Sequence, residues 1–201
     1  MIVVVDYGVG NLFSLISSLK AVNAQAIVSG DIAVIEKADK IILPGVGAFG
    51  DAVSKLKESG LFDVIIKRAN AGVPLLGICL GMQLLFEKSY EFGEFNGLGL
   101  IKGQICPLKD DVTSNLKIPH IGWNQLNVIK KDAILKYVDK GEYVYFVHSF
   151  YAKPSDDTSS TTEYGVKITA SVSNKNVFGC QFHPEKSGEV GLKILKAFCE
   201  L

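Results

Sequence analysis

Short apolar runs alternate with segments of helical periodicity along the first part of the chain. The apolar runs have the length of strands that are buried on both faces, and they cover residues 2–5, 26–28, 40–43 and 74–78. The segments between them carry apolar residues on one helical face, and they cover 12–19, 31–38, 51–59 and 61–71. This alternation predicts an α/β fold with a doubly wound, mostly parallel central sheet.

The later part of the chain adds strands of another kind. Residues 166–172 and 177–182 form a hairpin-like pair, which predicts an additional antiparallel portion of the sheet. Residues 99–105 and 142–151 are also expected as strands. The remaining stretches are expected as loops, and they cover 87–99, 118–124 and 154–165. None of them is long enough to link two domains, so residues 1–201 are expected to form a single domain.

Cys79 lies between a buried strand and a helix expected over 80–86. Gly77 and Gly81 flank it, which gives Gly-x-Cys-x-Gly, the thiol counterpart of the nucleophile elbow. Glycines allow a sharp, strained turn to close, and the helix that follows favours a thiolate over a thiol. The N–H of Leu80 would point at an oxyanion that forms on a substrate carbon. A buried core cysteine is the alternative, and this motif alone does not decide between the two.

A second motif, Gly-Cys-Gln-Phe-His183-Pro-Glu185, ends another apolar run much later in the chain. His183 and Glu185 are two residues apart, so on an extended segment they project to the same face. A base with a carboxylate beside it completes a Cys-His-Glu triad with Cys79. The alternative is a turn after a strand that carries a surface histidine and a surface glutamate.

Composition excludes several classes of function. Lysine and arginine number 21 against 21 acidic residues, so no basic field points to nucleic acid or to an anionic membrane. No apolar stretch reaches the ~18 residues that a membrane span needs, and the N-terminus lacks the features of a signal peptide. The four cysteines contain no C-x-x-C pair, so a reducing cytoplasm is the simplest setting. The three histidines lack metal-ligand spacing, so no metal is expected. A dinucleotide site is also rejected, because Phe13 stands where the third glycine after Gly8 and Gly10 would fall.

The two motifs together resemble the class I (triad) glutamine amidotransferases, through Gly-Ile-Cys-Leu-Gly-Met-Gln and the later Phe-His-Pro-Glu. The resemblance extends from Asp6 to the last helix. It implies hydrolysis of glutamine to glutamate and ammonia without a cofactor. Cys79 would attack the side-chain amide carbon, and His183, oriented by Glu185, would keep Cys79 as thiolate and protonate the leaving ammonia.

The same resemblance assigns the binding residues. The loop Pro-Gly45-Val46-Gly47 ends a strand, where α/β sheets bind ligands, and in the family it contributes to glutamine binding and the oxyanion hole. The family also implies that Gln83 contacts the substrate, and that the backbone groups of Ser149 and Phe150 meet the α-amino and α-carboxylate ends of glutamine. A peptide flip at Val46 is a further hypothesis, in which a partner controls the oxyanion hole.

One branch of the family is closer than the others. Asp-Tyr-Gly-x-Gly-Asn-Leu near the N-terminus and the segment Pro119-His120-x-Gly-Trp123-Asn124 resemble the glutaminase subunits of imidazole glycerol phosphate synthases. That branch implies a heterodimer with a (β/α)8-barrel cyclase subunit, which makes imidazole glycerol phosphate and aminoimidazole carboxamide ribotide in histidine biosynthesis. Pro119, Trp123 and Asn124 would face the cyclase, and His120 would be an interface or structural residue. His148, in turn, is expected as a satisfied strand-end histidine.

Two alternatives stay open. A paralogous glutaminase subunit could supply ammonia to a sugar-modifying amidotransferase for surface glycans. From another class, elbow-fold cysteine proteins include proteases, stress proteins and inactive binding modules. Those usually lack His-Pro-Glu after the last sheet strands, so its presence here speaks against them, and a glutaminase assay would discriminate.

Overall fold

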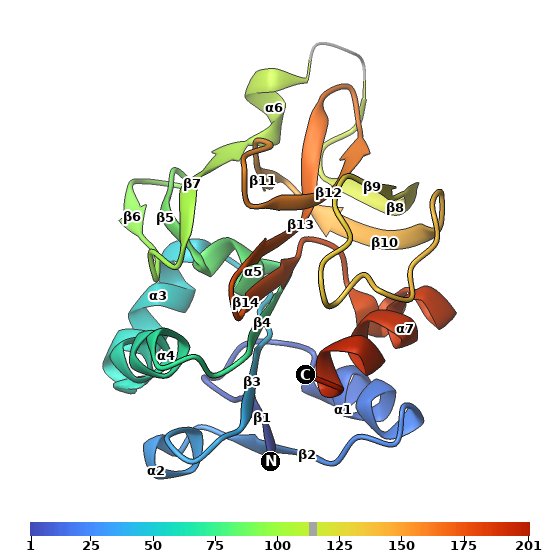
Figure 1. The fold of residues 1–201 in the computed structure, drawn as a ribbon. Coiled ribbons are helices and arrows are strands. Elements are labelled where there is room, and N and C mark those ends of the chain that lie inside the picture. Colours follow the sequence, from blue (N-terminus) through green and yellow to red (C-terminus); the bar gives the residue numbers. More distant parts are fainter. Residues whose placement is uncertain (113–115) are drawn as a thin grey trace.

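An eight-stranded mixed sheet forms the centre of the computed structural model, which describes residues 1–112 and 116–201 (Figure 1). The strand order is β2-β1-β3-β4-β14-β13-β12-β9. The first five strands pair in parallel and the last three join antiparallel. The strands are β1 (Ile2–Val5), β2 (Ala26–Ser29), β3 (Lys40–Leu43), β4 (Leu75–Ile78), β9 (Asn127–Val128), β12 (Thr158–Glu163), β13 (Lys167–Asn174) and β14 (Val177–Cys180).

Helices cover both faces of the parallel part of this sheet (Figure 1). In β1, Val3 and Val5 pack into the core beneath α3 and α4, whereas Ile2 and Val4 pack against α1 and α7. Both faces of the strand are therefore buried, which explains its uninterrupted apolar sequence. The helices around the sheet are α1 (Leu12–Ala21), α2 (Ile32–Ile35), α3 (Phe49–Glu58), α4 (Leu61–Asn70) and α7 (Gly188–Cys199). This arrangement confirms the predicted doubly wound sheet with an antiparallel portion.

Two smaller sheets lie above the carboxyl ends of the parallel strands (Figure 1). A four-stranded sheet has the order β11-β7-β5-β6, and an antiparallel ribbon pairs β10 with β8. Their strands are β5 (Phe86–Ser89), β6 (Phe95–Asn96), β7 (Ile101–Pro107), β8 (His120–Gln125), β10 (Tyr143–His148) and β11 (Phe150–Ala152). Three short helices complete the described chain, and they are α5 (Leu80–Leu84), α6 (Leu108–Asp111) and the 3-10 helix η1 (Pro184–Lys186).

Several segments differ from the sequence prediction, among them the strand expected over 142–151, which forms β10 and β11 in two different sheets. The helix expected over 80–86 ends at Leu84, because Phe86 begins β5, and the expected loop at 87–99 contains the end of β5 and all of β6. The expected loop at 154–165 contains β12, whose hydroxyl side chains are buried. The hydroxyls of Ser160 and Ser171 on the neighbouring β13 lie 2.6 Å apart. Cross-strand bonds of this kind replace the apolar contacts that usually identify a strand.

A further correction concerns 118–124, which was expected as a loop and forms most of β8. Its side chains alternate as in any strand, so that Ile121 and Trp123 face outward and His120 and Asn124 face inward. The strand was not predicted because polar residues on its inward face disguise the alternation of hydrophobic and polar positions.

Among the helices of the described residues, none has both the length and the apolar character that a membrane span requires.

Candidate active site

Cys79 stands at the turn between β4 and α5 in a strained backbone conformation, with φ 54° and ψ −109°. A Cβ added at Gly81 would lie 1.8 Å from the Leu43 carbonyl oxygen, and one added at Gly77 would lie 2.6 Å from the Gly81 carbonyl oxygen. Only glycine fits at either position. The N–H of Cys79 also donates to the Cys180 carbonyl at 2.7 Å, which ties the elbow to β14. The neighbouring strand therefore holds a conformation that costs of order 1–3 kcal/mol by itself.

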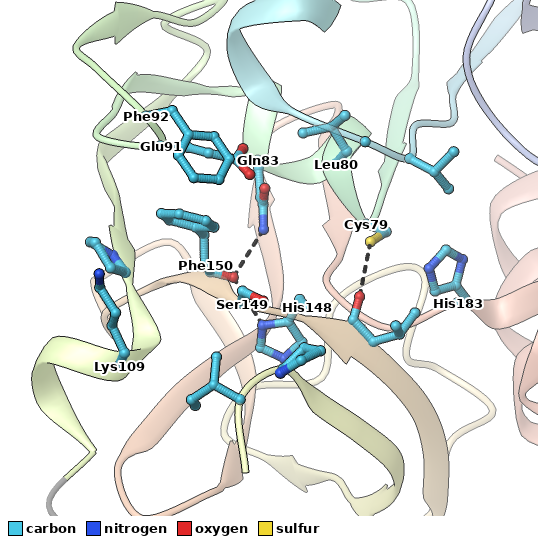
Figure 2. A pocket seen from close by; sticks show the side chains of 16 residues that line it. Cys79, Leu80, Gln83, Glu91, Phe92, Lys109, His148, Ser149, Phe150 and His183 are labelled. Atoms are coloured by element: carbon cyan, nitrogen blue, oxygen red, sulfur yellow. Dashed lines mark hydrogen bonds between the residues drawn. The ribbon is translucent and has the colours of Figure 1, made fainter.

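His183 and Glu185 follow β14, the strand next to β4. Because these two strands are parallel, their carboxyl ends bring His183 to Cys79 (Figure 2). His183 Nδ1 lies 2.7 Å from Glu185 Oε1, and both side chains are almost completely buried. The backbone N–H of His183 donates to the Tyr145 carbonyl at 2.9 Å, so β10 also holds the imidazole in place.

The two partners of His183 determine its charge. Burial alone would lower the pKa of His183, but hydrogen bonding to Cys79 and to the Glu185 carboxylate raises that pKa to about 10. At neutral pH the imidazole is therefore protonated between two acceptors. An imidazolium beside a sulfur stabilises the thiolate, which is the nucleophilic form of cysteine.

A cavity of about 530 Å³ opens beside this group, large enough for an amino-acid substrate (Figure 2). Most of the binding residues expected from sequence line it, and they are Val46, Gly47, Leu80, Gln83, Ser149 and Phe150. Pro119, which was expected at the partner interface, also lines this cavity. Gly45 lies behind that wall, where an added Cβ would meet the Tyr7 hydroxyl at 2.8 Å and the Gly81 nitrogen at 2.9 Å. The structure therefore gives Gly45 a steric role, since no side chain fits there.

The amide of Gln83 is held in one orientation. Its Nε2 donates to the Phe150 carbonyl at 3.0 Å and to Gln181 Oε1 at 3.0 Å. Gln181 Nε2 in turn lies 3.9 Å from the Cys79 sulfur. Because a carbonyl can only accept, the Gln83 oxygen must point the other way, toward the end of the cavity where Glu91 lies (Figure 2).

Several residues of the cavity wall were not predicted from sequence, chief among them Glu91, Phe92 and Lys109. Glu91 Oε2 accepts from the N–H of Phe49 at 2.7 Å, and burial raises the pKa of Glu91. Glu91 belongs to an irregular stretch without motif spacing, so only the folded chain shows that it faces the site. Tyr7 was also missed, and its hydroxyl donates to the Pro44 carbonyl at 2.8 Å, at the start of the Gly45–Gly47 loop.

Cys79 is the only cysteine among the residues that line the cavity. Burial raises the pKa of Cys180 well above its usual range, and burial also raises the pKa values of Cys106 and Cys199. These three thiols are therefore poor nucleophiles at neutral pH. The described residues contain no group of His, Cys, Asp and Glu that could hold a metal ion.

His120 and His148 form a buried pair at the cavity, and His148 is itself one of the residues that line it. Nδ1 of His120 lies 3.0 Å from Nε2 of His148. Burial lowers the pKa of His120 to about 4. Burial, with the nearby His120 and His183, lowers the pKa of His148 to about 3. Both imidazoles are therefore neutral at physiological pH.

We expect acid to destabilise the fold through this pair. The unfolded chain, with histidine pKa values near 6.5, binds protons that the folded pair excludes. The pair's stabilising effect is complete above pH 6.5 and is lost as the pH falls toward 4. His183 has the opposite sign, but its stabilisation is nearly complete by pH 6.5. The free energy of unfolding should therefore fall by about 3 kcal/mol between pH 7 and 5.

Urea unfolding at pH 7, 6 and 5 measures this loss. His148→Gln serves as the control, because glutamine can hydrogen-bond but cannot take up a proton in this range. Its free energy of unfolding should fall by roughly a third as much as that of the unaltered chain, because one histidine of the pair is gone and the opposing contribution of His183 remains. A stability that does not change between pH 7 and 5 would contradict the neutral pair.

Comparison with known proteins identifies the family of this chain. The family model for class-I glutamine amidotransferases matches residues 3–200. The "Imidazole glycerol phosphate synthase subunit HisH" of Lactococcus lactis is 52% identical over 201 residues, which covers 99% of this chain and 98% of that protein. The protein of the same name from Aquifex aeolicus is 50% identical, and the match covers 98% of this chain and 94% of that protein.

Solved structures show the same fold at much lower identity. A crystal structure of a glutamine amidotransferase superposes with a TM-score of 0.76 at 18% identity and covers 99% of both chains. PurLQS from Thermotoga maritima superposes with a TM-score of 0.72 at 24% identity, covering 99% of this chain and 97% of that one. With the family model matched over nearly the whole length, the chain belongs to the class-I glutamine amidotransferase family.

Proposed function

We propose that this chain is the glutamine-hydrolysing subunit of an imidazole glycerol phosphate synthase in histidine biosynthesis. The observation that carries the proposal is that Cys79 and His183 line an amino-acid-sized cavity, while Glu185 lies 2.7 Å from the Nδ1 atom of His183. Relatives named as subunits of that synthase are 52% and 50% identical over nearly the full chain, which favours this reading over a sugar-modifying paralogue.

In the proposed reaction, the Cys79 thiolate attacks the side-chain amide carbon of glutamine. The N–H of Leu80 and the Gly45–Gly47 loop stabilise the oxyanion that forms on the amide oxygen. The C–N bond then breaks as the His183 imidazolium gives its proton to the departing nitrogen, which leaves as ammonia. Water attacks the resulting thioester, His183 accepts the proton from that water, and glutamate leaves with the thiolate restored.

Substrate recognition follows from the charges in the cavity wall. The Glu91 carboxylate suits the α-ammonium group of glutamine, and Lys109 at the rim suits the α-carboxylate. The backbone of Ser149 and Phe150 lies between these two ends of the cavity (Figure 2). A zwitterion therefore meets charges of both signs, and the Gln83 oxygen can accept from the substrate's amino or amide nitrogen.

An exposed apolar surface on the β8–β10 ribbon provides a place for a partner subunit. Ile121, Trp123 and Tyr143 are all more than half exposed. The Trp123 ring lies 6.2 Å from the Tyr145 ring, and the position of a Cβ on Gly188 is 3.9 Å from the indole. This surface is thus next to the segment that follows His183. Ammonia in bulk water at neutral pH would be protonated and lost, so a cyclase partner docked here would have to take it directly.

Expression with a tagged (β/α)8-barrel cyclase tests the proposal. The complex should form, hydrolyse glutamine, and convert the ribulosyl precursor to imidazole glycerol phosphate with glutamine as the nitrogen source. Hydrolysis without transfer to this acceptor, combined with activity on a sugar acceptor and its own partner, would favour the glycan-modifying alternative. No hydrolysis in a well-folded complex would refute the glutaminase assignment.

We expect the isolated chain to hydrolyse glutamine slowly and the complex to hydrolyse it roughly 10²–10³-fold faster. Gly47 has a φ of +100° and open space around it, so the Val46 peptide can turn at little cost. One N–H directed away from the oxyanion accounts for a loss of that size. Glutaminase rates of the chain, the complex, and the complex with an acceptor analogue measure the effect.

Trp123→Ala should weaken the complex or let glutamate form faster than the cyclase product. Ile27→Ala is the matched control, since Ile27 is an exposed apolar residue on the edge strand β2, far from the ribbon (Figure 1). Equal glutaminase rates for the isolated chain and the complex would contradict control of the oxyanion hole by the Val46 peptide. Equal effects of the two substitutions would remove the ribbon from the interface.

A further inference from the structure

A line of hydrogen bonds runs inward from the ribbon to the wall of the cavity. Asn124 Nδ2 donates to the Glu163 carbonyl at 2.9 Å and lies 3.3 Å from His120 Nε2. The contact between the two histidines follows at 3.0 Å. His148 Nδ1 then lies 2.9 Å from the Phe150 carbonyl oxygen.

Chemistry assigns every proton in this line. The Phe150 carbonyl can only accept, so Nδ1 of His148 carries the proton and its Nε2 is an acceptor. Nδ1 of His120 must therefore donate to that Nε2, which leaves the other nitrogen of His120 to accept from the Asn124 amide. All donors point toward Phe150, and both histidines are neutral Nδ1–H tautomers.

The surroundings prevent the rings from turning. His120 is stacked on Tyr164 with ring centroids 4.1 Å apart and on Phe146 with centroids 4.8 Å apart. Both histidines are buried. Because the His120 ring is packed on both faces and hydrogen-bonded at both nitrogens, it has a single orientation. The position of Asn124 therefore determines, through the two rings, the position of the Phe150 carbonyl.

The end of the line is what makes it more than a set of satisfied core residues. The Phe150 carbonyl also accepts from Gln83 Nε2, the amide that lines the cavity. Gln83 shares its other proton with Gln181, whose amide faces the Cys79 sulfur at 3.9 Å. The same carbonyl oxygen is therefore the common acceptor of the line from the ribbon and of the network around the nucleophile.

We propose that Asn124, His120 and His148 are positioning residues that fix the Phe150 carbonyl and, through it, Gln83. They connect the outward face of β8, where Trp123 precedes Asn124 in sequence, with the wall that receives the substrate. Asn124, which the sequence analysis assigned to the partner interface, lies on the inward face of the strand. The part of this inference that concerns glutamine rests on the proposed function.

The tautomers give a test that needs no substitution. In ¹⁵N-labelled protein at pH 7, the ring nitrogens of His120 and His148 should show two Nδ1–H tautomers, the form that free imidazole side chains favour less. We call the line of hydrogen bonds from Asn124 through His120 and His148 to the Phe150 carbonyl the relay. An Nε2–H tautomer at either histidine would contradict it. This measurement is independent of activity, so it decides the relay even if the complex does not hydrolyse glutamine, an outcome that would instead refute the proposed substrate.

Two substitutions of His148 test the positioning role in the complex. In His148→Gln the amide takes the place of Nε2 and no longer donates to the Phe150 carbonyl, so KM for glutamine should rise roughly tenfold with kcat within about threefold. In His148→Asn the amide takes the place of Nδ1 and keeps that bond but loses the contact with His120, so KM should rise only severalfold, clearly less than in His148→Gln. Equal KM values for the two variants, or a change in kcat alone, would overturn the proposal.

A second pair of variants covers the case in which those proteins do not fold. Asn124→Asp removes the donor to His120, and it should raise KM for glutamine severalfold. Gln125→Glu makes the same amide-to-acid change on the outward face of β8, and KM should not change. Equal effects of the two substitutions would show that charge on the ribbon, and not the relay, controls the cavity.

Discussion

Cys79→Ala should lower glutamine-dependent turnover by about 10⁶-fold, to the limit of detection. Cys79 is the one thiol that lines the cavity, and His183 is protonated beside it. Without the sulfur no thioester forms, and the oxyanion hole has no intermediate to stabilise. Steady-state glutamate release by the complex measures the loss.

The cyclase reaction driven by ammonium salts serves as the internal control. It should be unchanged in the Cys79→Ala complex, because added ammonia bypasses the glutaminase site. Cys199→Ala, a thiol at the end of α7, should retain normal glutamine-dependent activity. If a folded Cys79→Ala complex loses the ammonium-driven reaction as well, Cys79 has a role in assembly instead of catalysis.

Glu185→Gln should lower turnover by roughly 10³–10⁴-fold while the chain stays folded. The substitution keeps the shape of the side chain and removes the charge that faces His183 Nδ1 at 2.7 Å. The pKa of His183 should fall from its raised value of about 10, because one of the two groups that hold the proton is gone. A smaller fraction of the protein molecules then contains both the His183 imidazolium and the Cys79 thiolate. The His183 ring also loses the carboxylate that orients it.

A pH profile of kcat/KM separates this effect from a general loss of structure. The alkaline limb, where His183 loses its proton, should move to lower pH in Glu185→Gln. Glu189→Gln provides the comparison, since Glu189 is an exposed carboxylate in the first turn of α7. Undiminished turnover in Glu185→Gln would remove Glu185 from the mechanism.

The parallel half of the sheet was readable from sequence because each strand is buried on both faces. Val3 and Val4 face opposite cores, so the apolar run has no polar interruption. The elbow was readable from sequence for a related reason. At positions 77 and 81, beside Cys79, there is room for a hydrogen atom but not for a side chain. Strong steric demands leave few residue choices, and those choices appear directly in the sequence.

The strands that were not predicted, β8 and β12, are buried through polar contacts and not through apolar packing. Ser160 and Thr161 in β12 are buried through hydroxyl contacts and strand pairing, and His120 in β8 is buried through its ring nitrogens. Partners of this kind lie on distant segments, so no local pattern identifies them. Glu91 is the same case in the site, because its orientation depends on the N–H of Phe49 at the start of α3.

The residues of the elbow, Gly77, Cys79 and Gly81, should respond differently to selection for the amount of folded protein in cells and to selection for its enzymatic activity. In a library of all single substitutions, positions 77 and 81 should tolerate almost nothing in either selection, because any side chain collides with backbone. Position 79 should behave in the opposite way, since its φ of 54° and ψ of −109° suit glycine better than any other residue. Cells that carry glycine there would accumulate more of the protein and have none of its chemistry. The nucleophile is thus the one residue of the elbow that is maintained against the fold's own preference.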